Sequence, residues 1–257
     1  MTGWLDPVRR ALDHGRPRWF FRDDDAGWDD ARLASLIDAF RTAGVRVDLA
    51  AIPAAVAPRL GRRLGELIDE GSISVHQHGW AHADHETSGR RSEFGAGRPA
   101  SAQARDIARG RRALAYLLGR QPAPIFTPPW NRCTRVTAGL LPPLGFTAIS
   151  VDASAPPSGI SGLTEIPVTL DWVRSFSRGG GAGLARELHR AAAAPGDAAI
   201  GVMLHHAAMG DDDLAALRDL LSLLRERAAS ELTCMERLAD ENSLTPVSPS
   251  GHGARAR

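Results

Sequence analysis

Residues 18–52 read RWFFRDDDAGWDDARLASLIDAFRTAGVRVDLAAI, and this stretch decides the fold class. Its apolar start, 18–23, predicts a strand that ends in acidic residues. Asp29 and Asp30 can then cap a helix, because apolar residues follow at helical spacing as far as Gly44, a natural stop. Residues 45–52 predict a second strand. A strand, a helix and a strand in succession indicate a parallel pair joined by a crossover helix.

The rest of the chain repeats this alternation. Further strands are expected at 72–76, 123–127, 146–151, 163–170 and 198–204, and further helices at 60–70, 100–118, 134–141, 184–194 and 211–239. The pattern predicts an α/β protein with a parallel sheet, and the number of units favours a barrel. We expect one domain over residues 1–240 and a disordered tail, rich in Ser, Pro, Gly and Arg, over 241–257. Reactive residues should follow the carboxyl ends of the strands.

Composition excludes several classes of function. The chain has 31 basic and 30 acidic residues, so its charge gives no reason to expect nucleic acid as a partner. All basic residues apart from histidine are arginine, which rules out chemistry on a lysine Schiff base. Two cysteines make no disulfide framework, and no stretch is apolar and long enough to span a membrane. We therefore expect a soluble, cytoplasmic protein, with its oligomeric state left open.

Three adjacent carboxylates, Asp23, Asp24 and Asp25, follow the first expected strand. Such groups repel one another unless a cation lies nearby. Successive side chains of a strand point in opposite directions, so the three can have different functions. An acidic turn that caps the next helix is an equally good interpretation of these residues alone.

Histidines follow the third expected strand in the sequence HQHGWAH, residues 76–82. The spacing of His78 and His82 places both imidazoles on one side of a turn, where they can bind one divalent ion. The pair alone is a weak signal, and the acid triplet at a neighbouring strand end strengthens it. Two imidazoles and one carboxylate leave positions open for water and substrate, as in catalytic metal sites.

Two later strand ends carry further candidates. Residues 127–132, TPPWNR, combine a rigid proline pair with Trp130, whose flat face suits stacking on a sugar ring, although a stiffened loop with a core tryptophan is equally compatible. His205 and His206 follow the last strand, where one can act as a general acid or both can form a structural pair. The long polar loop 79–99 is expected to lie over the metal and shape the pocket.

In this order, over residues 19–209, the motifs resemble those of the polysaccharide deacetylases of the NodB-homology carbohydrate esterase group. That family implies a distorted (β/α) barrel, often with seven strands, which becomes our fold expectation. In its acidic motif the first aspartate is the catalytic base and the second binds the metal. A His-x-x-x-His motif supplies two more ligands, an Arg-x-Pro motif lines the groove, and a late Leu-x-His motif supplies the acid.

Transferred residue by residue, the resemblance implies the following site. The metal ligands are Asp25, His78 and His82, the base is Asp24, the acid is His205, and Trp80, Trp130, Asn131 and Arg132 bind substrate. The aspartate register stays open, because Asp23 as base and Asp24 as ligand is the alternative.

Two departures from the family pattern affect this transfer. Thr127 stands where the family has an arginine that orients the base, and Arg22 or Arg132 could take its place. Asp152 stands near a further family acid, but the usual tryptophan after it is missing.

The resemblance thus implies a metal-dependent hydrolase, with a divalent ion such as zinc, that removes an acetyl or other acyl group from an N-acylated sugar or sugar conjugate. Two alternatives remain. The same three ligands occur in non-haem iron oxygenases. A non-haem iron oxygenase is therefore the first alternative. The second is a glycan-binding protein without turnover, since the arginine of the third motif is absent.

Overall fold

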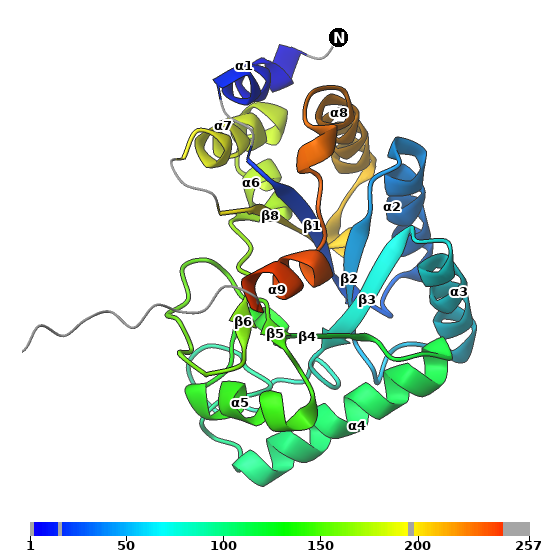
Figure 1. Ribbon diagram of the computed structural model, residues 1–257, viewed down its shortest axis with the longest axis vertical. Coiled ribbons are helices and arrows are strands. Elements are labelled where there is room, and N and C mark those ends of the chain that lie inside the picture. Colours follow the sequence, from blue (N-terminus) through cyan, green and yellow to red (C-terminus); the bar gives the residue numbers. More distant parts are fainter. Residues whose placement is uncertain (1–2, 15–16, 195–197, 244–257) are drawn as a thin grey trace, which may run out of the picture.

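The computed structural model describes residues 3–14, 17–194 and 198–243 (Figure 1). The strands are β1 (Trp19–Ala26), β2 (Val47–Ala51), β3 (Ile73–His78), β4 (Ala123–Thr127), β5 (Ala148–Ile149), β6 (Thr164–Glu165), β7 (Leu170–Asp171) and β8 (Ile200–Leu204). The helices are α1 (Asp6–His14), α2 (Asp30–Ala43), α3 (Pro58–Asp69), α4 (Ala100–Leu118), α5 (Arg135–Leu140), α6 (Trp172–Ser177), α7 (Gly180–Ala192), α8 (Asp211–Arg227) and α9 (Met235–Ser243).

All strand pairs are parallel, in the order β6-β5-β4-β3-β2-β1-β8-β7. The sheet curls into a distorted (β/α) barrel, as expected, with eight strands in place of seven. The count differs because the extended segment expected at 163–170 forms two short strands. Its first part pairs with β5 and its last part with β8, so one stretch of chain joins the two edges of the sheet.

The first crossover unit forms for the reasons that its sequence indicates. The Asp29 carboxylate accepts the backbone N–H of Arg32 at 3.1 Å and so caps α2. Gly44 ends the helix in the left-handed conformation, at φ 63°, where glycine has no steric penalty. The helix expected at 100–118 and the strand expected at 123–127 have those bounds in the structure.

The helix expected at 211–239 is wrong as a single element. The chain leaves α8 at Arg227, passes beside β1, where the Thr233 N–H bonds the Trp19 carbonyl at 2.9 Å, and then forms α9. Residues 241–243 of the expected tail therefore end a helix, and residues 244–257 lie outside the described part. Helices α1 and α6 were not expected from the sequence, since both are short.

Apolar side chains pack on both faces of the sheet. The larger cluster lies between the strands and the helices of the outer layer. A smaller cluster lies inside the curl, where Met235, Leu238 and Ala239 of α9 meet residues of β1, β4, β5 and β8. Figure 1 shows α9 lying across the sheet near β4, β5 and β6. One end of the barrel is thus filled by a helix, which leaves the other end for a site.

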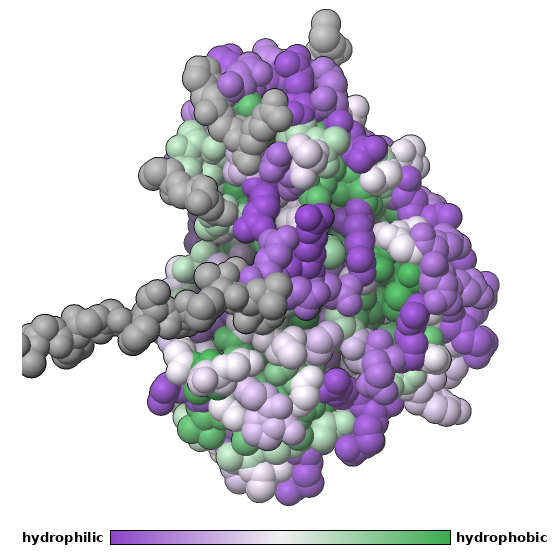
Figure 2. Space-filling model, in the orientation of Figure 1, coloured by the Kyte–Doolittle hydropathy of each residue, from purple (hydrophilic) through white to green (hydrophobic). Residues whose placement is uncertain are grey.

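The exterior is mostly polar. The face drawn in Figure 2 is covered largely by hydrophilic side chains, with smaller, scattered apolar areas. None of the helices in the described ranges combines the length and hydrophobicity that crossing a bilayer requires.

Candidate active site

The strand ends opposite α9 bring the expected motifs together. Strands β3, β2, β1 and β8 are consecutive neighbours in the sheet. Asp25 lies at the end of β1, His78 at the end of β3, and His205 directly after β8. Because all these strands are parallel, their carboxyl ends meet at one edge of the barrel, where residues distant in sequence converge.

Asp25, His78 and His82 form a compact group of potential metal ligands. The Asp25 Oδ1 atom lies 3.3 Å from Nε2 of His78 and 3.3 Å from Nε2 of His82. One ligand atom from each residue lies within 4.8 Å of the others. This buried Oδ1 atom has no hydrogen-bond partner, which is unusual for a buried carboxylate oxygen. A divalent cation fits this set of donors.

The surroundings of His78 fix which of its nitrogens faces the site. Its Nδ1 atom lies 3.0 Å from the Thr127 carbonyl, which can only accept, so Nδ1 carries the proton. The lone pair of Nε2 therefore faces Asp25. Metal-binding histidines commonly use such a bond to orient the ring. Burial alone would raise the pKa of Asp25, but the neighbouring His78 and His82 lower it, which keeps the carboxylate charged.

The loop that carries His82 is held by Glu93. Its carboxylate accepts the backbone N–H groups of Trp80 at 3.2 Å, Ala81 at 2.8 Å and His82 at 3.2 Å. At Gly79, φ is 58°, and a Cβ atom there would lie 2.2 Å from Glu93 Oε2, so only glycine fits. Glu93 is fully buried and shapes the loop that carries His82.

Asp24 points into the barrel, where Arg22 binds it with two hydrogen bonds. Nε of Arg22 donates to Oδ1 and Nη2 to Oδ2, both at 2.8 Å. Burial alone would raise the pKa of Asp24, but Arg22 and the nearby histidines bring it to about 2. The guanidinium also donates to Ser150 Oγ at 2.8 Å and Asn131 Oδ1 at 2.7 Å. Arg22 and Arg132 were the two candidates to replace the arginine that the family has at the position of Thr127. Arg22 is the one that contacts Asp24.

The two histidines after β8 lie in different surroundings. His205 is 30% exposed, and its Nε2 lies 4.0 Å from Asp24 Oδ2. His206 is buried outside the barrel, where Nδ1 donates to Asp23 Oδ2 at 2.7 Å and Nε2 donates to the Trp28 carbonyl at 2.6 Å. Asp23 is thus the partner of a structural histidine, while His205 faces the site.

These groups line an open pocket of about 410 Å³. Beside the charged groups and histidines already described, its walls are Trp28, Arg91, Trp130 and Asn131. The rings of Trp28 and Trp130 flank His82, with centroids 4.8 and 4.3 Å from its ring. Trp28 is 41% exposed, and nothing in the sequence singled it out, because it belongs to no motif.

Two of the residues expected to bind substrate lie elsewhere. Trp80 packs under the guanidinium of Arg109, 4.3 Å from its ring centroid. Arg132 donates to the Arg91 carbonyl at 3.0 Å. Neither is among the described residues that line the pocket. Asp152 is also outside it, and its carboxylate accepts the N–H and O–H of Ser154.

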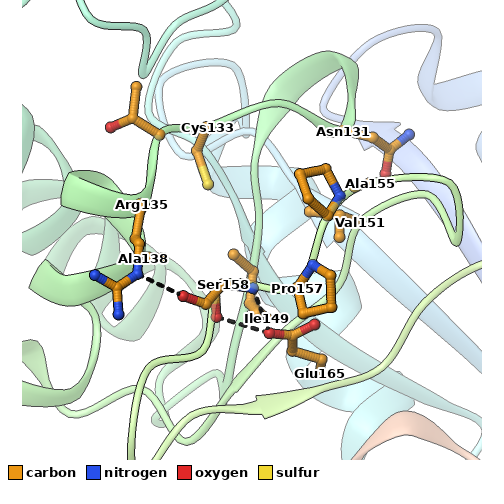
Figure 3. A pocket seen from close by; sticks show the side chains of 12 residues that line it. Asn131, Cys133, Arg135, Ala138, Ile149, Val151, Ala155, Pro157, Ser158 and Glu165 are labelled. Atoms are coloured by element: carbon orange, nitrogen blue, oxygen red, sulfur yellow. Dashed lines mark hydrogen bonds between the residues drawn. The ribbon is translucent and has the colours of Figure 1, made fainter.

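A second, smaller cavity of about 130 Å³ adjoins the first, and Asn131 lines both. Figure 3 shows Asn131 at one end of it and Glu165 at the other. There Glu165 accepts the N–H and O–H of Ser158, and the Ser158 carbonyl accepts Nε of Arg135.

Comparison with known proteins gives no match to a protein-family profile and none to a curated protein sequence. Solved structures do match. A Mycobacterium smegmatis protein assigned to the polysaccharide deacetylases is 18% identical, with a TM-score of 0.65, and 92% of this chain and 94% of that one are covered.

Two further solved structures differ in what their descriptions say of activity. The family 4 carbohydrate esterase from Streptomyces lividans, in complex with acetate, is 18% identical with a TM-score of 0.56, covering 83% of this chain and 91% of that one. A Bacillus anthracis protein described as a pseudoenzyme of the same family is 12% identical with a TM-score of 0.58, covering 89% and 67%. The chain therefore has the fold of the polysaccharide deacetylases of carbohydrate esterase family 4, at low sequence identity.

Proposed function

We propose that this protein is a metal-dependent hydrolase that removes an acetyl or other acyl group from the nitrogen of an N-acylated sugar or sugar conjugate. One observation carries the proposal: the buried Asp25 Oδ1 atom has no hydrogen-bond partner, and it lies 3.3 Å from Nε2 of both His78 and His82. The fold and the adjacent Asp24 and His205 support it.

The three ligands would be Asp25, His78 and His82. A divalent ion such as zinc, when bound there, polarises an acyl carbonyl and lowers the pKa of a coordinated water toward about 7. The register with Asp24 as base and Asp25 as ligand fits these contacts better than the alternative, since Asp23 is occupied by His206 outside the barrel.

Two side chains of the protein would carry out the two proton transfers of the reaction, one from the attacking water and one to the departing amine. Asp24 is ionised and held in a fixed orientation by Arg22, so it can accept a proton from the attacking water. His205 is close to Asp24 yet partly exposed, so it can reach the departing amine and donate a proton to it. Trp130 offers a flat face beside His82 for the sugar ring.

Metal analysis followed by acetate release tests the proposal. The purified protein, loaded with zinc, should bind one equivalent and release acetate from at least one member of a panel of N-acetylated sugars. His78→Ala should lose both, because it removes one of three ligands. A variant that keeps its full metal content would show that the site is elsewhere.

The second candidate is a glycan-binding protein on the same fold. It is favoured by Thr127, which replaces the family arginine, and by the pseudoenzyme among the structural neighbours. Glycan binding without hydrolysis, in protein whose metal site is filled, would support this candidate over the enzyme. The iron oxygenase alternative lacks support, since its ligands usually lie on an antiparallel sheet and all strand pairs here are parallel.

A further inference from the structure

Three arginines, Arg90, Arg91 and Arg132, lie together at the mouth of the catalytic pocket. Arg91 lines the pocket, and the pKa of Arg132 is lowered first by burial and then by the nearby charges of Arg90 and Arg91. Among the described residues, no carboxylate forms an ion pair with any of the three. Asp84 is the nearby acid, and its Oδ1 atom accepts the N–H groups of Glu86 and Ser92, both at 3.0 Å.

The backbone of Arg91 is held in place, although its side chain is exposed. Its carbonyl accepts Arg132 Nη1 at 3.0 Å. Ser92 next to it is bonded to Asp84, and Glu93 is buried against the loop that carries His82. The guanidinium lies over the Trp130 ring, 5.3 Å from its centroid, which is within the range of cation–π attraction.

The chemistry of this arrangement identifies what it can bind. A guanidinium stacked on an indole still presents its N–H groups at the edge of its plane, in the geometry that carboxylates and phosphates accept. Clustered like charges cost free energy, and an anionic ligand group removes that cost. The backbone N–H groups of Glu86 and Ser92, and then the charge of Arg91, lower the pKa of Asp84, so this acid offsets part of the positive charge. A neutral sugar would add nothing to that offset.

We propose that the substrate carries a carboxylate or phosphate close to its N-acyl group, and that Arg91 binds this anionic group at the pocket mouth. This inference rests on the proposed function for the identity of the scissile bond. Arg132 would act as a positioning residue, since it holds the backbone of Arg91 and is absent from the pocket wall.

Three probes distinguish a neutral substrate from one with a carboxylate or a phosphate. N-acetylglucosamine is neutral, N-acetylmuramic acid carries a carboxylate, and N-acetylglucosamine 6-phosphate carries a phosphate. Binding is measured by calorimetry and hydrolysis by acetate release, on the zinc-loaded protein. At least one charged probe should bind more tightly than the neutral one, and its advantage should shrink as salt is raised, because the arginines are exposed.

Arg91→Ala should weaken binding of the preferred charged probe about tenfold, as expected for a lost hydrogen bond to a charged group. Its effect on the neutral probe should stay below about twofold on the same reasoning. Arg91→Lys should restore part of the loss, since a lysine keeps the charge without the planar fork. The matched control is Arg225→Ala. Arg225 is exposed and lies beside Gly44, at the end of the barrel opposite the pocket.

Equal loss for charged and neutral probes in Arg91→Ala, or no preference for charge in the unaltered protein, would overturn the inference. Charge-dependent binding that Arg91→Ala removes, with no hydrolysis of any probe, would support the anion site and count against the hydrolase. The two proposals can therefore fail separately.

Discussion

Asp24 and Asp25 are neighbours in the chain but differ in what surrounds them. Asp25→Asn should lose metal, because a neutral amide oxygen is a poorer ligand than a carboxylate. Asp24→Asn should keep the metal, yet lose turnover by about 10²–10⁴-fold, because the amide cannot accept a proton. Zinc stoichiometry and acetate release from one substrate check both variants. If Asp24→Asn lost the metal and Asp25→Asn kept it, the roles would be reversed.

Asp23 has a structural role, so its substitution should act on stability. In the structure Asp23 and His206 form a fully buried pair, and both imidazole nitrogens donate hydrogen bonds. Burial alone would lower the pKa of His206, but Asp23 raises it to about 9. Asp23→Asn leaves a buried imidazolium without its counter-charge, which costs about 3 kcal/mol.

Urea denaturation at pH 6 measures that cost, with Asp38→Asn as a control, since Asp38 is 72% exposed. The raised pKa of His206 sets the pH dependence. Its contribution to stability is complete below pH 6.5, the ordinary histidine value, and is lost as the pH rises toward 9. The difference between the unaltered protein and Asp23→Asn should therefore shrink over that range. A constant difference would mean that the pair is not charged.

At the scale of elements, the loop between β3 and α4 depends on one carboxylate. Glu93 accepts three consecutive backbone N–H groups, including that of His82, one of the three proposed ligands. Glu93→Ala should release the loop and lower zinc affinity about 10–100-fold, as is usual when a group that orients a ligand is removed. Competition with a chromogenic chelator measures the affinity. Glu66→Ala, an exposed position on α3, is the control and should leave it unchanged.

Elements defined by local signals were predictable, while the groups that support the site were not. The cap at Asp29 and the stop at Gly44 follow from side chains next to the helix ends. The contacts of Arg22 with Ser150 and Asn131 join residues more than 100 positions apart. Glu93 lies within the loop, but the backbone N–H groups that donate to it could not be identified before the path of the loop was known. Sequence patterns report the nearest neighbours along the chain and say little about such partners.

At the scale of the molecule, the barrel class was predictable and its closure was not. Alternating strands and helices indicated parallel strands, and the structure confirms them. The segment at 163–170 reads as one extended stretch, and only the folded sheet shows that it pairs with β5 first and β8 last. The break that sends α9 into the barrel depends on contacts with β1, which lies some 200 residues earlier in the chain.

The end of the barrel that α9 fills contains a buried acid with consequences for overall stability. Asp48 on β2 is 1% exposed; its Oδ2 atom accepts the N–H of Met235 at 2.9 Å, and its Oδ1 atom has no partner. Burial raises its pKa to about 7. A raised pKa means that folding favours the protonated acid, so its contribution to stability is complete below about pH 4 and is lost as the pH rises to 7.

Asp48→Asn should remove this dependence, because an amide stays neutral and its oxygen can still accept the Met235 N–H. Relative to the variant, the unaltered protein should lose on the order of 4 kcal/mol of unfolding free energy between pH 4 and pH 8. Urea denaturation across that range measures both proteins. His206 titrates identically in the two, so the difference between their profiles isolates Asp48. Parallel profiles would mean that Asp48 keeps an ordinary pKa in the folded barrel, and that α9 closes its end without burying a titrating acid.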